Sequence, residues 1–460
     1  MTEIYNKFKH DVLNKAFDDE HRKKIGFNID RYNDAVVRGK QQYVNLELAR
    51  QRAAHLKYKA IIELEKNLVD FESNFERNGG KVIWAQDAAD ALREIDAIMV
   101  KHSATKVVKS KTMISEEINL NEHLESRQIE SLETDLGEFI VQLAGEQPYH
   151  IVTPAMHKSK EDVARLFNEK FNLPANSTPE QITAFVRRFL RDKFMNADVG
   201  ITGANFIISD TGSICLTENE GNGILSMSLP KVHIAIAGIE KVLPSLKHLD
   251  IFWPLLATHG TGQNLTAYNS IISGPRQEGE TDGPQDMYVI LLDNGRSEVL
   301  ARKHQRRALS CIRCGACLNT CPVYKTIGGH AYGTTYSGPI GSVITPWMKG
   351  MNDYKHLSYA SSLCGSCTEV CPVKINLHEL LLYNRNDSVK LRYYSVFDAL
   401  SMFAWKKIML NRKWMDTGSG KLKNLILNKV FAKAWGPRRK LPTLSERNFK
   451  QLWEERREGK

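Results

Sequence analysis

The sequence predicts an α/β domain with a largely parallel sheet, followed by a cysteine-rich domain and flanked by helical extensions. Three observations support this prediction. Apolar strands alternate with amphipathic helices between residues 79 and 298, seven of the eight cysteines lie between Cys311 and Cys371, and both ends lack strand patterns. The expected segments are therefore 1–78, 79–298, 299–385 and 386–460.

The N-terminal segment is predicted to be helical. Residues Gln41 to Phe75 contain no glycine or proline, and their apolar side chains recur at helical spacing. Gly79 and Gly80 follow and are typical of a helix C-cap.

Strands and helices then alternate. Expected strands are Lys81–Ala85, Lys106–Ile114, His150–Ala155, a pair within Asp198–Gly221 with turns at Gly203 and Gly212, Lys231–Gly238 and Met287–Gly295. Helices are expected to begin near Asp87, after Ser115 as an N-cap, and at Lys160. This alternation favours a parallel sheet.

The cysteines form two related runs. The first is Cys311-x-x-Cys314-x-x-Cys317-x-x-x-Cys321-Pro322, and the second is Cys364-x-x-Cys367-x-x-x-Cys371-Pro372. The first run has the spacing of bacterial ferredoxins, in which three thiolates bind one [4Fe–4S] cluster and the fourth reaches a second cluster. Zinc is the alternative, because Cys-x-x-Cys pairs also build zinc ribbons, but the repeated Cys-Pro endings favour iron–sulfur clusters.

Cross-ligation between the runs predicts two sites. Cluster one would take Cys311, Cys314, Cys317 and Cys371, and cluster two would take Cys321, Cys364 and Cys367. A full second run would have a cysteine where Ser361 stands. We expect two [4Fe–4S] clusters, the second with a non-cysteine fourth ligand such as Ser361 or water; a [3Fe–4S] cluster is the alternative. The Gly-rich stretch Gly328–Gly350 is expected to be a loop, in a domain with little regular structure.

Positive charge concentrates at the C-terminal end. The net charge is +10, and residues 385–460 contain 19 Lys and Arg against 7 Asp and Glu. This region should be helical after Leu380, with a break at Thr417–Gly420 and a linker from Pro437 before a final helix. Its charge fits a solvated face, or docking to an acidic partner or electron carrier or to an anionic membrane surface. No recognition motif accompanies it, so we expect no nucleic acid.

No apolar run reaches the roughly 18 residues of a membrane span, and the N-terminus lacks an apolar signal segment. Clustered cysteines are typical of a reducing compartment. The expected location is the cytoplasm, including the inner face of the membrane as a peripheral site.

Three stretches together resemble the lactate utilization protein B family of iron–sulfur proteins with a LUD domain: Ala197–Pro244, Gly260–Arg276 and the cysteine region. The resemblance implies a LUD fold similar to that of the sugar-phosphate isomerase and CoA-transferase group. It also implies two companion subunits, a cysteine-rich protein and a small LUD-domain protein, which act with this chain in oxidising L-lactate to pyruvate during growth on lactate.

The same fold similarity draws attention to two acids. Glu218 or Glu220, within Thr217–Gly223, could be a nucleophile as in CoA transferases, could bind a ligand, or could only shape a turn, which is the favoured interpretation. Thr202, Gly203 and Gly212 are candidates for binding an anion.

Further candidates are weaker. His233 is expected to be a core or cleft histidine, and Cys215 a buried small apolar residue. His259 is expected in a flexible turn and is a candidate base for a hydroxyl proton, and Arg276 a candidate partner for a substrate carboxylate.

The sequence favours an electron-transfer component over a complete enzyme. It contains no G-x-G-x-x-G motif after a strand and no Walker A motif, so no flavin or nicotinamide fingerprint accompanies the clusters. A CoA- or acyl-transferring enzyme with structural clusters is one alternative, and electron transfer from another 2-hydroxy acid is a second. A nucleic-acid-binding iron–sulfur protein is a third. Catalytic residues stay unassigned.

Overall fold

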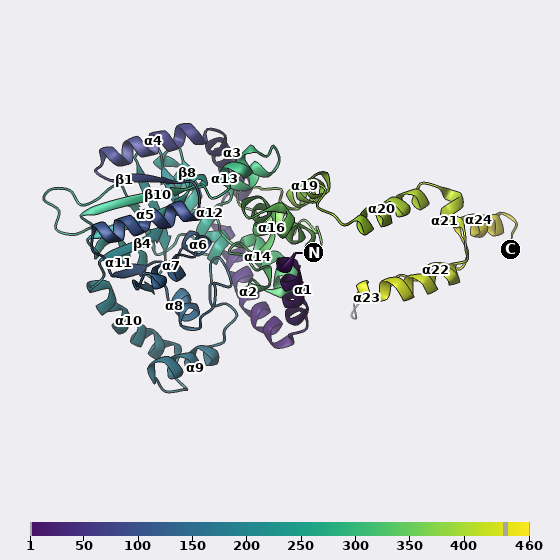
Figure 1. The fold of residues 1–460 in the computed structure, drawn as a ribbon, viewed down its shortest axis with the longest axis horizontal. Helices are drawn as coiled ribbons and strands as arrows, with labels where there is room; N and C mark the ends of the chain where they lie inside the picture. The colour runs from purple at the N-terminus through teal and green to yellow at the C-terminus, as the bar shows by residue number, and fades with distance from the viewer. Residues whose placement is uncertain (1, 436–439, 460) are drawn as a thin grey trace. The chain divides into compact units, whose positions relative to one another are not determined.

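The computed structural model describes residues 2–435 and 440–459, which form two compact units, 1–391 and 392–460 (Figure 1). In the first unit, the N-terminal helices, the α/β segment and the cysteine segment share one continuous apolar core, which includes Ile25, Phe252, Leu318 and Val343. The boundaries between the four segments expected from the sequence stay predictions.

A six-stranded parallel sheet forms the centre of the first unit, in the order β1-β10-β7-β4-β2-β3. Its strands are β1 (Lys81–Ala85), β2 (Lys106–Lys109), β3 (Glu130–Glu133), β4 (Val199–Gly203), β7 (Val232–Gly238) and β10 (Asp286–Leu292). The predicted parallel α/β fold is confirmed.

Both faces of this sheet are covered. Along β7, Ile234 and Ile236 belong to a core shared with helix α5 (Ala88–Lys101), whereas Ala235 and Ala237 belong to a core shared with helix α4 (Leu64–Arg77). Successive side chains of a strand point to opposite faces, so a central strand with helices on both sides must be apolar throughout.

A second, four-stranded sheet has the order β8-β5-β6-β9. It contains β5 (Phe206–Ile208), β6 (Ser213–Glu218), β8 (Val242–Leu243) and β9 (Tyr268–Ile272), with β6 antiparallel to β5 and β9. Residues 198–221 therefore form three strands instead of the predicted pair, because the chain leaves the parallel sheet at Gly203 and begins a hairpin of the second sheet.

The N-terminal helices are α1 (Glu3–Ala16), α2 (Asp19–Gly39), α3 (Leu46–Ile62) and α4. The segment Gln41–Phe75 is helical, as predicted, and forms two helices: a 3₁₀ turn ends at Gln42, Asn45 caps α3, and Glu63 separates α3 from α4. Gly79 has φ +88° and follows the last turn of α4, as the C-cap prediction requires.

Two local predictions in the α/β segment are also wrong. The strand expected over Lys106–Ile114 ends at Lys109, and Thr112, not Ser115, caps the next helix, α6 (Met113–Glu117). Ser115 is buried inside α6, where its hydroxyl accepts a hydrogen bond from Lys109 Nζ at 2.6 Å.

No strand forms at His150–Ala155, which is a series of turns. His150 Nδ1 accepts backbone N–H groups of Val152 at 3.1 Å and Thr153 at 3.2 Å, so the side chain holds the local turn.

The remaining helices of the α/β segment are α7 (Leu120–Ser126), α8 (Leu136–Leu143), α9 (Lys160–Phe171), α10 (Pro179–Met195), α11 (Asn222–Ser228), α12 (Leu249–Thr261) and α13 (Arg296–Ala301). The predicted starts near Asp87, which caps α5, and at Lys160 are confirmed.

The cysteine segment is mostly helical, contrary to the prediction of little regular structure. Its helices are α14 (Ala316–Thr320), α15 (Pro322–Ile327), α16 (Gly338–Met348), α17 (Met351–Tyr359), α18 (Ser366–Glu369) and α19 (Leu377–Lys390). Helix α16 replaces the second half of the expected glycine loop. A Cβ at Gly341 would lie 1.8 Å from Tyr336 O, so glycine here serves close packing instead of loop flexibility.

The second unit contains α20 (Val396–Met409), α21 (Arg412–Asp416), α22 (Gly420–Ile426), α23 (Ala432–Trp435) and α24 (Phe449–Arg457). The predicted break at Thr417–Gly420 separates α21 from α22, and the start of the predicted linker at Pro437 lies outside the described residues. Many large apolar side chains of this unit are exposed, among them Phe397, Phe403, Trp405, Trp414 and Trp453. Within the described residues, no helix is both long and apolar enough to cross a membrane.

A buried charge network joins the sheet to the cysteine segment. Arg296 donates to both carboxylate oxygens of Glu117 at 2.8 Å and to Glu240 at 2.5 Å. Glu240 also contacts Arg313 at 3.4 Å, and Tyr336 OH donates to Glu117 at 2.6 Å. Burial opposes the ionisation of Glu240, but Arg296 and Arg313 outweigh it and lower its pKa to about 2.

We expect Glu240→Gln to destabilise the protein by about 3–5 kcal/mol, because it leaves the buried guanidinium of Arg313 without a carboxylate and that of Arg296 with Glu117 alone. Since the folded-state pKa lies below the ordinary value of 4.5, this stabilisation is present above pH 4.5 and is lost as the pH falls towards 2. Urea unfolding between pH 7 and pH 3 measures both effects.

The matched control is Asp286→Asn, which removes the partly exposed ion pair between Asp286 and Lys81 at 2.8 Å. It should cost at most about 1 kcal/mol. Equal losses for the two variants would contradict the role given to the buried network.

Candidate functional site

The first cysteine run lies in a tight turn followed by two short helices. Cys311 follows a 3₁₀ helix (Gln305–Ser310), Cys317 lies in α14, and Cys321 precedes Pro322 at the first position of α15. Positive φ values at Arg313 (60°) and Gly315 (79°) bend the chain on both sides of Cys314. This bend gathers the first three thiols around one space.

That space is a small cavity lined by four thiols. Cys311, Cys314, Cys317 and Cys371 line it together with apolar side chains, among them Ile151, Ile312, Ile340 and Val373. Burial, strengthened by the neighbouring thiols, raises the pKa of Cys314 and of Cys317. Backbone N–H groups point at sulfur, from Arg313 to Cys311 Sγ at 3.4 Å and from Ile375 to Cys371 Sγ at 3.3 Å. Four thiols in an apolar cavity with N–H donors fit a [4Fe–4S] cluster.

The N-terminal helices hold the loop of Cys371 in place. Arg50 of α3 donates to the backbone oxygens of Cys371 at 2.9 Å and of Glu369 at 2.5 Å, and Lys374 forms an ion pair with Glu47. The fourth thiol of the cavity is thus positioned by residues more than 300 positions earlier in the chain.

A second group contains Cys321, Cys364 and Cys367, whose thiols influence one another electrostatically. Cys364 is exposed, and hydrogen bonds from the Ser366 backbone and from the side chains of Ser366 and Ser362 lower its pKa. The Ser361 hydroxyl instead accepts the Leu363 N–H at 3.1 Å. Ser362 is a neighbour of this group that sequence reasoning missed, because spacing alone pointed to position 361.

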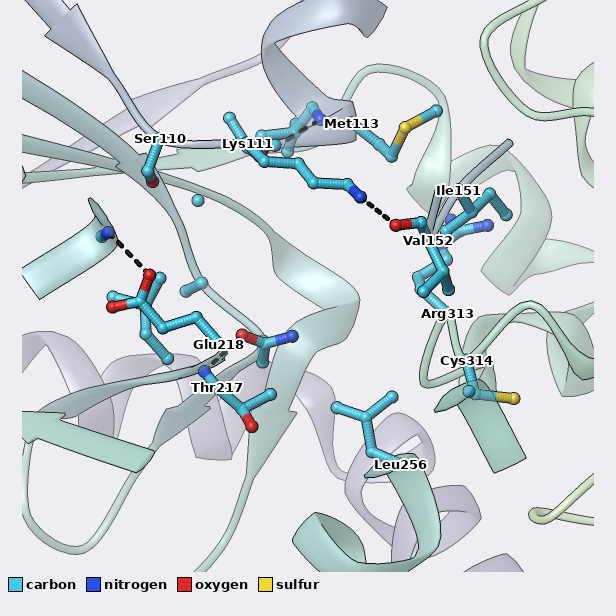
Figure 2. A pocket seen from close by; sticks show the side chains of 18 of the residues that line it. Ser110, Lys111, Met113, Ile151, Val152, Thr217, Glu218, Leu256, Arg313 and Cys314 are labelled. Carbon is cyan, nitrogen blue, oxygen red and sulfur yellow. Dashed lines mark hydrogen bonds between the residues drawn. The ribbon is translucent and has the colours of Figure 1, made fainter. Parts of the chain in front are cut away.

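A larger cavity of about 400 Å³ lies where the parallel strands β4 and β7 end. Carboxyl ends of parallel strands are a common location for ligands. Figure 2 shows Thr217 and Glu218 on one side of this cavity and Arg313 and Cys314, from the cysteine segment, on the other. Residues of two segments therefore enclose one space.

Glu218 and Glu220 both line this cavity but differ in their contacts. Both carboxylate oxygens of Glu218 accept backbone N–H groups at the start of α11, from Gly223 at 2.7 Å and Ile224 at 2.9 Å. Glu218 therefore shapes the turn, which is the role the sequence favoured. Enclosure under the neighbouring loop and the charge of Asp135 raise the pKa of Glu220 to about 7, although solvent reaches this side chain.

The anion-binding candidates are not brought together. Thr202 Oγ1 pairs with His233 Nε2 at 2.9 Å inside the core, so His233 is the buried histidine that was expected. Gly203 lines the cavity, whereas Gly212 packs against Asn74 and Phe75. Cys215 is fully buried in β6, and burial raises its pKa to about 12.

The turn predicted at His259 is wrong, and Arg276 lies away from the cavity, so its proposed contact with a substrate carboxylate stays a prediction. His259 does not lie in a turn but inside α12. There its Nδ1 donates to Leu255 O at 2.9 Å, and burial lowers its pKa to about 4. Arg276 lies on the exposed loop after β9 and does not line the cavity. The cations that do line it are Lys111, Lys241, Arg296 and Arg313. None of these four cations was among the candidates named from the sequence, although Arg313 lies between two of the predicted ligands, Cys311 and Cys314.

Comparison with known proteins agrees with this architecture. The LUD domain model matches residues 68–292, and the 4Fe-4S dicluster domain model matches residues 307–375. Lactate utilization protein B of Bacillus cereus is 46% identical over 341 residues, covering 74% of this chain and 72% of its own length. Lactate utilization protein B 2 of Bacillus mycoides shows the same identity and coverage. A DUF162 family protein of known structure from Deinococcus radiodurans aligns over 50% of this chain and 98% of its own, with 14% identity and a TM-score of 0.29.

The raised pKa of Glu220 predicts a pH-dependent effect of Glu220→Gln. A carboxyl group whose folded-state pKa is above its ordinary value of 4.5 costs stability as the pH rises from 4.5 to about 7. We expect Glu220→Gln to be more stable than the wild type at pH 8, by less than about 1 kcal/mol because water screens the group, and equally stable at pH 4.5. Melting temperatures at the two pH values test this, and a gain of equal size at both would contradict the assignment.

Proposed function

The chain belongs to the lactate utilization protein B family, and we propose that it is the iron–sulfur electron-transfer subunit of a multi-protein system that oxidises L-lactate to pyruvate. The supporting observation is the arrangement of its cysteines in two groups within one compact unit. The names of the relatives supply the substrate, and such a system would support growth on lactate.

We assign Cys311, Cys314, Cys317 and Cys371 to the first cluster, and Cys321, Cys364 and Cys367 to the second. The four-thiol cavity supports the first group, and the electrostatic interactions among the remaining thiols support the second. When bound, the two clusters would carry one electron each, which suits the relay of electrons released by an oxidation in a partner.

The protein environment differs between the two groups. The first lies in an apolar cavity with two N–H donors to sulfur, whereas Cys364 of the second is exposed. Burial and hydrogen bonds to sulfur tune reduction potentials, so the two clusters should differ in potential. The exposed group is the natural point of exchange with an external electron carrier.

The second cluster lacks a fourth cysteine. We propose a [4Fe–4S] cluster with a non-cysteine fourth ligand, with a [3Fe–4S] cluster as the alternative. Ser362 joins Ser361 and water as a candidate ligand, since its side chain interacts with Cys364.

The alternative of CoA or acyl transfer has weak support, because Glu218 uses both oxygens to bind the start of α11 and is not available as a nucleophile. Electron transfer from another 2-hydroxy acid remains the alternative closest to the proposal.

For partners, we propose the two companion subunits, a cysteine-rich protein and a small LUD-domain protein. The C-terminal unit would be their docking site. It combines a surplus of lysine and arginine with exposed aromatic side chains, the composition of a surface that meets an acidic partner. An anionic membrane surface on the cytoplasmic side would suit the same chemistry.

Replacing single cysteines tests the cluster assignment. We expect Cys371→Ser to lose about half of roughly eight iron atoms per chain, because it removes one of four ligands to the first cluster. Anaerobic iron and sulfide analysis, with EPR before and after dithionite reduction, measures this. Cys215→Ser is the control and should keep all its iron, since Cys215 is buried in β6. Stoichiometric zinc without iron would refute the assignment.

Charge reversal tests the docking role of the C-terminal unit. The double substitution Lys406→Glu and Lys407→Glu, on α20, should weaken association with the companion subunits at least tenfold and reduce its dependence on salt. Pull-down at 50 and 300 mM salt measures this. Lys59→Glu, on partly exposed Lys59 of α3, is the control. Association that is indifferent to both substitutions and to salt would exclude an electrostatic contact.

A further inference from the structure

We propose that the 400 Å³ cavity at the end of the parallel strands binds a redox-active organic anion, and that this ligand exchanges electrons with the adjacent first cluster. Ligand binding in this cavity does not depend on the proposed function, but the electron exchange rests on that function. The volume lies within the range of about 300–1,000 Å³ that is typical of small-molecule sites.

Two polar groups in this cavity have no partner in the described structure. Ser110 Oγ and Arg313 Nη1 are both buried and make no hydrogen bond. Buried polar groups are nearly always hydrogen-bonded, so two unpaired groups in one cavity indicate a missing ligand. Arg313 is held in place by stacking on Tyr336, at 4.1 Å from the ring centroid, and by its contact with Glu240.

The charges near Arg313 favour an anion. Arg296 satisfies Glu117 with two hydrogen bonds and Glu240 with a third, which leaves Arg313 only a contact of 3.4 Å with Glu240. Lys241 also lines the cavity and makes no hydrogen bond among the described residues. Burial lowers its pKa to about 8, so at neutral pH it is still largely protonated. A carboxylate or phosphate bound here would complete the coordination of both cations.

Lys111 extends the cationic region. Its ammonium group donates to Val152 O and lies on the side of the cavity where Arg313 lies, as Figure 2 shows. An ammonium group has three donors, so Lys111 can keep this hydrogen bond and still bind an acid group.

The rest of the cavity suits an organic body. Met113, Ile151 and Leu256 line it as apolar surfaces, while Glu218 lies at the other side. A three-carbon acid would fill only part of such a volume. A ring-bearing carrier with an acid group, of the flavin mononucleotide class, would fill more of it.

The cavity and the four-thiol pocket share a wall. Ile151, Arg313 and Cys314 line both spaces. A ligand in the larger cavity would therefore be separated from the first cluster by the thickness of one residue. This shared wall is the reason to assign a redox-active ligand, because a merely structural ligand has no need of that neighbour.

The test is calorimetric titration of the anaerobic full-length protein with two probes, flavin mononucleotide and L-lactate. Binding of flavin mononucleotide supports the proposal, because a reduced flavin can give up its two electrons one at a time to a cluster that accepts one at a time. Binding of L-lactate alone refutes the redox part, because lactate releases two electrons together as a hydride, which a one-electron cluster cannot accept. Lys111→Met and Lys241→Met should each weaken binding about tenfold or more, because each removes a charge-assisted hydrogen bond.

Lys247→Met is the matched control, since Lys247 is exposed and lies outside this cavity, and it should leave binding unchanged. Melting temperatures of all variants separate lost binding from lost folding. Ser110→Ala removes only an unpaired hydroxyl of the cavity and should weaken binding less than the lysine variants do. If neither probe binds, or if both lysine variants bind as the wild type does, the site is refuted.

Electron exchange has its own readout. The bound probe should shift the EPR spectrum of the reduced first cluster, and the shift should disappear in Lys111→Met. Binding without any spectral change would refute the redox part of the proposal. A preparation that binds the probe but holds no iron in any state would refute the proposed function while supporting the ligand site.

Discussion

The buried network of Arg296, Glu117, Glu240 and Arg313 is the constraint on which the arrangement of the first unit depends. It connects α6, the end of β7, the start of α13 and the turn between Cys311 and Cys314. Charges without water need several partners each, so the network tolerates only a narrow set of positions for these elements. One consequence is that the cysteine turn is fixed against the carboxyl edge of the sheet, and the larger cavity forms between them.

The sequence predicted those parts of the structure that depend on local patterns. The apolar runs within Lys231–Gly238 and Met287–Gly295 form the strands β7 and β10, because central strands of a parallel sheet must be apolar on both faces. The run Lys81–Ala85 forms the edge strand β1. The LUD and dicluster domains were likewise visible, since their motifs are continuous in sequence. Local patterns failed where one particular side chain or one close approach of the backbone decides the conformation. His150–Ala155 has the composition of a strand but is a set of turns held by the His150 ring, and the glycines of α16 permit close packing instead of forming a loop.

The same distinction applies to the candidate site. Cysteine spacing places three candidate ligands in one turn, so these candidates could be named from residues alone. The cations of the larger cavity come from positions 111, 241, 296 and 313, and nothing in the spacing of Lys111 or Lys241 relates them to each other. His259 and Arg276 were better candidates by residue type and neighbouring glycines, yet one is sealed in a helix and the other lies on an exposed loop. Residue type alone therefore does not show which basic side chains line the cavity; the fold decides this.

The contact between Arg50 and the loop of Cys371 has a consequence for biosynthesis. The two residues are separated by 321 positions. The contact can therefore form only after nearly the whole first unit has been translated. Loop closure over such a distance belongs to the late steps of folding. The three thiols of the first run leave the ribosome earlier and can receive iron and sulfide only as an incomplete site. Under the proposed ligand assignment, maturation of the first cluster is thereby coupled to completion of the chain, and a truncated product ending before Cys371 would lack its fourth ligand.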